Sequence, residues 1–86
     1  MIVLYTSKAE ADLKALPIGI KARILDKVDW YCQQKDPLKF SITLSGSGGK
    51  LHRFRIGNYR AIFMISNGAV SIAMIISVRH RREVYD

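Results

Sequence analysis

Arginine is the residue whose placement in this chain most clearly suggests chemistry. Six of the seven arginines fall within the last 36 of 86 residues, where they form two clusters. The first cluster is Arg53, Arg55 and Arg60, and the second is Arg79, Arg81 and Arg82. His80 lies between Arg79 and Arg81, and Tyr85 follows the second cluster. Like charges gathered in one half of a small domain repel one another, so the clusters are easiest to understand if they meet a polyanion.

The composition supports this interpretation. The net charge of the chain is +7 and its pI is near 9.9, which favours nucleic acid, an acidic protein or an anionic membrane surface as a partner. The 49% hydrophobic and 24% charged content is that of one globular domain, which we expect to span residues 1–86.

The single cysteine, Cys32, excludes an internal disulfide and fits a reducing compartment. The first residues lack the features of a signal peptide. The longest apolar stretch, at 73–76, is far too short to span a bilayer. We therefore expect a soluble, cytoplasmic protein that does not act at a membrane.

Two helices are predicted in the first half of the chain, after a short strand at 2–5. Ser7 and Glu10 have the spacing of a capping box, in which the Ser7 hydroxyl accepts from the Glu10 N–H. The first helix should end near Leu16, and the second should run from Pro17 to about Gln34. Apolar residues at helical spacing predict one buried stripe on the second helix: Ile20, Ile24, Leu25, Val28, Tyr31 and Cys32. Lysines and arginine on these helices (Lys14, Lys21, Arg23 and Lys27) are expected to form a solvated face, with contact to RNA as the alternative.

Three strands are predicted in the second half, at roughly 51–56, 59–66 and 69–78. The pairs Gly57-Asn58 and Asn67-Gly68 separate them, and both pairs favour two-residue hairpin turns. The order β-α-α-β-β-β predicts an α+β fold, in which an antiparallel-dominated, twisted sheet carries the two N-terminal helices on one face.

Two-residue turns would sort the side chains of these strands onto two faces. The face expected under the helices carries Phe54, Ile56, Tyr59, Ala61, Phe63, Ile65, Val70, Ile72, Met74, Ile76 and Val78. The other face carries Arg53, Arg55, Arg60, Ile62, Met64, Ser71, Ala73, Ile75, Ser77 and Arg79. In this register Arg55 lies opposite Arg60, Arg60 lies opposite Ile75, and the small residues of the last strand leave a shallow trough.

The predicted pairing of Arg55 with Arg60 is unfavourable for folding. Like charges opposed across a ladder cost from a few tenths to about 1 kcal/mol. Arginine forks, however, bind phosphate oxygens bidentately and keep their charge at neutral pH. The arginine face therefore suggests a site for a phosphodiester backbone. The alternative is that these arginines serve solubility and protect the sheet against edge pairing.

These residues also resemble a known family. The stretch LHRFRIGNYRAIF at 51–63, followed by VRHRREVY at 78–85, is similar to the RelE/ParE superfamily of bacterial type II toxin–antitoxin toxins, whose pattern reads roughly YRLRVGDYRVIY and then GHRREVY. The resemblance covers nearly the whole chain and implies a RelE-like fold. In this superfamily the RelE branch cleaves messenger RNA in the ribosomal decoding site, whereas the ParE branch poisons DNA gyrase and lacks the nuclease residues.

The resemblance implies a role for each arginine of the first cluster. Arg53 and Arg55 fall where the RelE branch has paired basic residues on a strand, and Arg60 matches its arginine after the tight turn. Cleavage of RNA without a metal requires the 2′-hydroxyl to attack the adjacent phosphorus, and the charge on the phosphorane must be stabilised. We expect Arg60 to be the main stabiliser, with help from Arg53 and Arg55.

The resemblance also implies roles for the second cluster. Arg81 fits the late arginine of the family, and Tyr85 fits its C-terminal tyrosine. Tyr85 is the candidate general base or a base stacker, and either Arg81 or His80 is the candidate acid. Arg79 and Arg82 are expected to contact RNA together with the arginines of the first cluster.

No cofactor is expected. His52, His80 and Cys32 are too dispersed to suggest a metal site, and His52 is expected to be a half-buried packing residue.

The expected partners are a cognate antitoxin, messenger RNA in the ribosomal A site and ribosomal RNA. The sequence leaves two alternatives open: a gyrase poison of the ParE kind without nuclease activity, and a basic RNA-binding module without catalysis.

Overall fold

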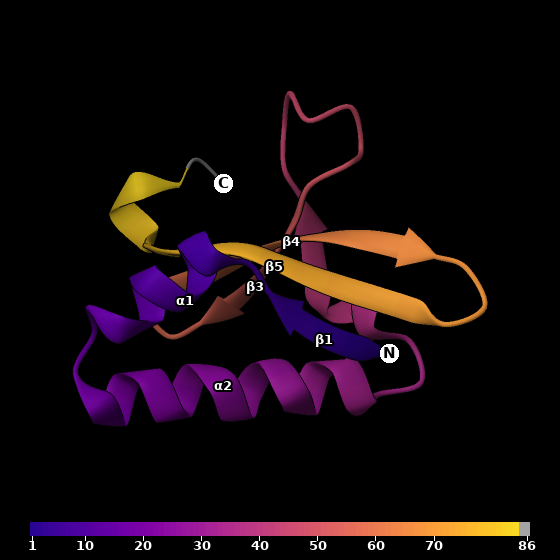
Figure 1. The fold of residues 1–86 in the computed structure, drawn as a ribbon. Coiled ribbons are helices and arrows are strands. Elements are labelled where there is room, and N and C mark those ends of the chain that lie inside the picture. Colours follow the sequence, from indigo (N-terminus) through magenta and orange to yellow (C-terminus); the bar gives the residue numbers. More distant parts are fainter. Residues whose placement is uncertain (85–86) are drawn as a thin grey trace.

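The sheet has five strands in the order β1-β5-β4-β3-β2, with two helices on one of its faces (Figure 1). The computed structural model of the chain describes residues 1–84. Its elements are β1 (Ile2–Tyr5), α1 (Ser7–Lys14), α2 (Ile18–Gln33), β2 (Ser41–Thr43), β3 (His52–Ile56), β4 (Tyr59–Asn67) and β5 (Ser71–His80), with short 3-10 helices η1 (Pro37–Phe40) and η2 (Arg81–Glu83). Strand β1 is parallel to β5, and the other pairs are antiparallel. The predicted α+β fold is confirmed.

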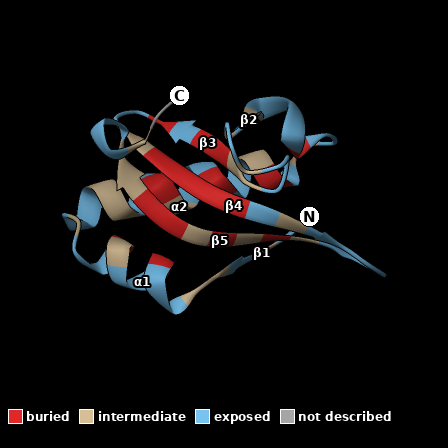
Figure 2. Ribbon diagram, turned by 90° about the horizontal axis from the view of Figure 1, so that it is seen from above, coloured by how far each residue is buried: buried red, intermediate tan, exposed pale blue. Residues whose placement is uncertain are grey.

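The core lies between the helices and the sheet. The apolar stripe predicted for α2 is buried at Ile24, Val28 and Cys32. Opposite them the rings of Phe54 and Phe63 stack with their centroids 4.3 Å apart. In Figure 2 the buried residues concentrate on β3, on β4 and in the middle of β5, whereas the tip of the β4–β5 hairpin projects into solvent. Apolar burial on one face of the sheet therefore stabilises the fold.

The start of α1 differs from the prediction by one residue. Thr6, rather than Ser7, is the N-cap, and its hydroxyl oxygen accepts from the Ala9 N–H at 3.1 Å. The reason is that Thr6 still belongs to the edge of the sheet. Its N–H donates to the Ile75 carbonyl at 2.9 Å and its hydroxyl donates to the Ile76 carbonyl at 3.1 Å. The backbone is therefore extended at Thr6, and the helix begins after it.

The second helix begins at Ile18 with Pro17 as its N-cap, close to the prediction. Neither helix of residues 1–84 is long and apolar enough to cross a membrane.

The elements that were not predicted include η1, η2 and the edge strand β2. Ser41 pairs with Phe54 and Thr43 pairs with His52, so β2 extends the sheet beyond β3. A strand of three residues is too short to show a period in the sequence, and η1 is a single turn. Both β2 and η1 therefore lack a periodic signal.

The first hairpin forms as predicted. Ile56 pairs with Tyr59, and Arg55 pairs with Arg60. Gly57 has a φ of +57°, a conformation that residues with a Cβ adopt at a cost. A glycine at this position therefore allows the two-residue turn.

The predicted register of the second hairpin is wrong. Asn67 pairs with Ser71, so the connection spans residues 68–70 instead of two residues. The register then shifts between Ile62 and Phe63, which pair with Ser77 and Ile75 and leave the residue between these two as a β-bulge.

The three-residue connection reverses the faces of the first half of β5, and the bulge restores the predicted faces beyond it. Ala73 and Ile75 lie under the helices and are fully buried. Ile72 and Met74 face the other way, and Val70 lies in the exposed connection. Val78 and Arg79, beyond the bulge, keep the faces predicted for them.

Helix α1 holds the bulge in place. Beyond Tyr5, which pairs with Ile75, strand β1 no longer covers the edge of β5. There Asp12 Oδ2 accepts from the Val78 N–H at 2.9 Å, and Asp12 Oδ1 accepts from Lys8 Nζ at 2.6 Å. A side chain of α1 thus replaces the missing strand neighbour at Val78.

The environment of Asp12 stabilises its charged form. Partial burial acts to raise the pKa of the carboxyl group. The hydrogen bonds from Lys8 and from Val78, together with the charges of Lys8 and Arg79, outweigh this effect and hold the pKa below its ordinary value.

We predict that Asp12→Ala lowers the free energy of unfolding by about 1–3 kcal/mol, because the Val78 N–H loses its acceptor. Asp12→Asn keeps an oxygen for Val78 and should lose less. The folded-state pKa of Asp12 lies below the unfolded value of about 3.9, so its charge contributes stability above that pH and the contribution disappears as the pH falls through the folded-state pKa.

Urea denaturation between neutral and acidic pH measures both effects, with Asp26→Asn on the exposed side of α2 as the matched control. Equal losses in Asp12→Ala and Asp26→Asn would contradict the role of Asp12.

Candidate phosphate-binding site

Three arginines form a row across three strands on the face of the sheet away from the helices. Arg55 on β3 pairs with Arg60 on β4, and Arg60 pairs in turn with Arg79 on β5. We call these three residues the arginine row. The sequence predicted that all three share this face but placed Ile75 opposite Arg60. The longer β4–β5 connection and the bulge in β5 together place Arg79 at this position instead.

Arg60, the central residue of the row, is only 4% exposed. Its Nη1 donates to the carbonyl of Gly57 at 3.0 Å and to the carbonyl of Tyr59 at 2.8 Å. A charged group removed from water is tolerated when it is hydrogen-bonded. The β3–β4 turn therefore fixes the guanidinium of Arg60 in place, so that little side-chain entropy remains to be lost on binding an anion.

Arg53 lies in the next row of the same face. It is 1% exposed and is flanked by Ile42 on β2 and Ile62 on β4. Arg55 is exposed, and its backbone carbonyl accepts from the Tyr31 hydroxyl at 3.1 Å. Helix α2 therefore braces the strand that carries Arg53 and Arg55.

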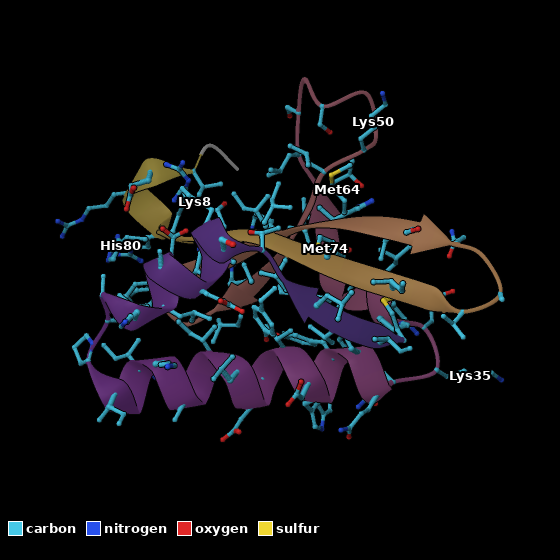
Figure 3. The ribbon with its side chains drawn as sticks, viewed as in Figure 1. Lys8, Lys35, Lys50, Met64, Met74 and His80 are labelled. Carbon is cyan, nitrogen blue, oxygen red and sulfur yellow. The ribbon has the colours of Figure 1, made fainter. Side chains whose placement is uncertain are left out.

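The predicted trough of small residues is not formed as expected. Ala73 lies under the helices, and of the small residues only Ser77 lies beside the arginines, opposite Ile62. Farther along β4 and β5 this face is apolar, because Met64 pairs with Met74 there. Figure 3 shows Met64, and Lys50 of the β2–β3 loop, on the side of the sheet away from α2.

His80 has a structural role and is not brought to the arginine row. It pairs with Tyr59, and the two rings meet edge to face with centroids 5.4 Å apart on the side of the helices. His80 is also the N-cap of η2: its Nδ1 accepts from the Arg82 N–H at 3.3 Å. Glu83 completes this cap, because its Oε1 accepts from the His80 N–H at 3.3 Å. Glu83 Oε2 also forms an ion pair with Arg79 Nη1 at 3.6 Å.

Arg81 is brought to the turn that holds Arg60. The Arg81 N–H donates to the Asn58 carbonyl at 2.7 Å. The side chains of Arg81 and Arg82 are both exposed. Tyr85, which the sequence suggested as a general base, lies outside the described residues.

The sequence did not indicate that Arg23 belongs with this group. Its guanidinium lies against Gly57, with Nη2 3.5 Å from the position that a Cβ would occupy. Arg23 therefore approaches the β3–β4 turn from α2, while Arg60 and Arg81 approach it from β4 and η2. One arginine on an amphipathic helix carries no signal of such a contact, because the contact depends on how α2 packs against the sheet.

His52 and His80 are used in packing and capping. The His52 ring packs 5.4 Å from that of Phe63, as expected for a packing residue. Among residues 1–84, no three side chains of His, Cys, Asp or Glu come together in a way that could hold a metal ion. The arginine row and Arg53 offer the chemistry of guanidinium groups: binding phosphate and stabilising negative charge.

Comparisons with known proteins agree with the geometry. Residues 3–85 match the family described as ParE toxin of type II toxin–antitoxin system, parDE. The fold is similar to a chain of the toxin–antitoxin complex RelBE2 from Mycobacterium tuberculosis, with a TM-score of 0.75, 26% identity and coverage of 93% of this chain and 96% of that one. No curated protein matches.

Two archaeal structures are similar over almost the same length. The RelE–RelB complex of Pyrococcus horikoshii OT3 matches with a TM-score of 0.69, 28% identity and coverage of 93% of both chains. The RelB–RelE antitoxin–toxin complex of Methanococcus jannaschii matches with a TM-score of 0.65, 30% identity and coverage of 96% of this chain and 95% of that one.

We predict that Gly57→Ala destabilises the fold by about 1–2 kcal/mol, because alanine is strained at the positive φ of this turn. Gly68 is the matched control: it has no positive φ, and a Cβ there would meet nothing within 4 Å. Gly68→Ala should be neutral or stabilise by a few tenths of a kcal/mol. Chemical denaturation of the two variants compares these effects, and similar values for both would argue against a special conformation of the turn.

Proposed function

This chain belongs to the RelE/ParE superfamily and is a toxin of a type II toxin–antitoxin system, and on that basis we propose that it is an endoribonuclease that cleaves messenger RNA in the ribosomal A site. The proposed reaction needs no metal and takes place in the cytoplasm, where it inhibits translation.

The observation that supports the proposal best is the position, burial and hydrogen bonding of Arg60. It lies between Arg55 and Arg79, is almost fully buried and is held by two carbonyl groups. Attack of a 2′-hydroxyl on the adjacent phosphorus adds negative charge to the phosphoryl oxygens. A fixed cation stabilises such charge without reorganising at the moment of reaction. We therefore assign Arg60 as the main group that stabilises the charge on the phosphorane, and Arg53 and Arg55 as groups that assist it.

The proton transfers are assigned to the C-terminal segment. Tyr85 is the proposed general base, which takes the proton of the attacking 2′-hydroxyl, or a base stacker. Arg81 or His80 is the proposed acid, which protonates the 5′-oxygen as its bond to phosphorus breaks. The hydrogen bond from Arg81 to the turn favours Arg81, because His80 faces the helices. Phenols and guanidinium groups hold their protons well above neutral pH in model compounds. Both are weak acid–base catalysts at neutral pH, so we expect slow cleavage of free RNA and a large contribution from positioning in the ribosome.

The proposed partners follow from the same assignment. A cognate antitoxin is expected, since the similar structures from Mycobacterium tuberculosis, Pyrococcus horikoshii and Methanococcus jannaschii are toxin–antitoxin complexes. Messenger RNA and ribosomal RNA are the partners of the cleavage reaction.

A second candidate function is poisoning of DNA gyrase without nuclease activity. The description of the matching family, ParE toxin, favours it. The two functions differ in their cellular products. A gyrase poison leaves double-strand DNA breaks and induces a DNA-damage response, whereas an mRNA endonuclease leaves discrete cuts in messages that are being translated.

We predict that Arg60→Ala lowers mRNA cleavage by at least about a hundredfold, the usual cost of removing one stabilising donor, and that it abolishes growth arrest. Tyr85→Phe should also abolish growth arrest, because it removes the proposed base. Arg60→Lys retains a charge but loses the planar fork, so its activity should lie in between.

Primer extension on a cellular mRNA after induction of the chain measures cleavage, with and without an inhibitor of translation. Lys35→Ala, an exposed residue beyond α2, is the control and should cleave normally. Growth arrest by folded Arg60→Ala and Tyr85→Phe proteins, or DNA breaks without mRNA cuts, would overturn the nuclease mechanism.

A further inference from the structure

The β3–β4 turn connects the arginine row to the outer surface of α2. Arg60 binds the carbonyl of Gly57 from the row, and the guanidinium of Arg23 lies against the same glycine from α2. Two guanidinium groups from different elements are thus in contact with one residue. Because Arg60 is buried and Arg23 is exposed, positive charge continues from the arginine face around the turn and onto the helix.

A shallow groove follows the outer surface of α2 from Gly19 past Arg23 to Trp30. Its lining consists of Gly19, Ala22, Arg23, Asp26, Lys27 and Trp30. Gly19 and Ala22 keep the floor of the groove low, while Arg23 and Lys27 supply cations along its length. From Arg23 to Trp30 the helix rises by about 10 Å, a length that a short stretch of a single strand can span.

Trp30 lies at the far end of this groove. It is 45% exposed, and Lys27 Nζ lies 4.7 Å from the centre of its ring. An exposed aromatic ring beside a cation is the combination that single-stranded nucleic acid uses, with bases contacting the ring and phosphates contacting the charge. A membrane surface would require a broad apolar face, and Asp26 and Asp29 interrupt the exposed side of α2.

We infer that the groove on α2 binds a single RNA strand that continues from the arginine row, with Arg23 and Lys27 contacting its phosphates and Trp30 contacting a base. The inference rests on the proposed function, because it extends the RNA site from the scissile phosphate to the flanking nucleotides. In this arrangement Arg23 contacts the RNA at the β3–β4 turn, between the arginine row and the groove. Asp26, a carboxylate in the same groove, weakens this binding.

The chain carries its own probe of this site, because Trp30 is its single tryptophan. We expect a single-stranded RNA decanucleotide to quench the fluorescence of Trp30 in the full-length protein, and a trinucleotide held at the arginine row to leave it unchanged. Arg23→Ala and Lys27→Ala should each weaken decanucleotide binding about threefold to tenfold, and each should reduce the slope of log affinity against log salt by about 0.7. Asp26→Asn should strengthen it.

Lys35→Ala is the matched control, since Lys35 is exposed and follows α2 without lining the groove. It should bind both oligonucleotides as the wild-type protein does, and thermal denaturation of every variant separates lost binding from lost folding. Quenching by the decanucleotide that is lost in Arg23→Ala and kept in Lys35→Ala supports the inference.

Three results would overturn it: no binding of the decanucleotide, equal quenching by both oligonucleotides, or preferential binding of polyglutamate, which would indicate an acidic protein as the occupant. Cleavage of mRNA on ribosomes is measured separately. A protein that cleaves but shows no length dependence keeps the proposed function and loses the α2 groove.

Discussion

The alignment of the arginine row depends on how the edge of β5 is covered where β1 ends. The Thr6 hydroxyl donates to the carbonyl of Ile76, the bulged residue, and Asp12 accepts from the Val78 N–H just beyond it. These contacts fix the register by which Arg79 lies beside Arg60. A regular ladder continued from the tip of the hairpin would place a different residue there. Two polar side chains at the start of the chain thus position an arginine near its end.

The row itself opposes folding. Three guanidinium groups on neighbouring strands repel one another, and Arg60 is removed from water as well. The fold offsets this cost locally, because turn carbonyls accept from Arg60 and the aromatic stack of Tyr31, Phe54 and Phe63 anchors the strands beneath it. Such unfavourable clusters persist at functional sites when the surrounding structure compensates for them.

Much of the fold could be predicted from local sequence signals. The helix stripe of α2 and the Gly57-Asn58 turn are encoded by residues close together in the chain, so their pattern was sufficient. The second hairpin was not predictable in this way, because Asn67-Gly68 resembles a two-residue turn and the bulge depends on contacts with Thr6 and Asp12, about 70 residues away. The same limit applies to the site: Arg53, Arg55 and Arg60 were grouped correctly, whereas the contact of Arg23 with Gly57 arises only from helix packing.

The parallel pairing of β1 with β5 has a consequence for synthesis of the protein. Strand β1 is made first and has no partner until β5 follows at residues 71–80. The hydrogen bonds between β5 and the side chains of Thr6 and Asp12 likewise cannot form before β5 has been made. Contacts of such sequence separation form late in folding. The nascent chain therefore cannot complete its sheet, or align its arginines, while β5 is still inside the ribosome that is making it. Assembly of the arginine row is thereby delayed until β5 has emerged.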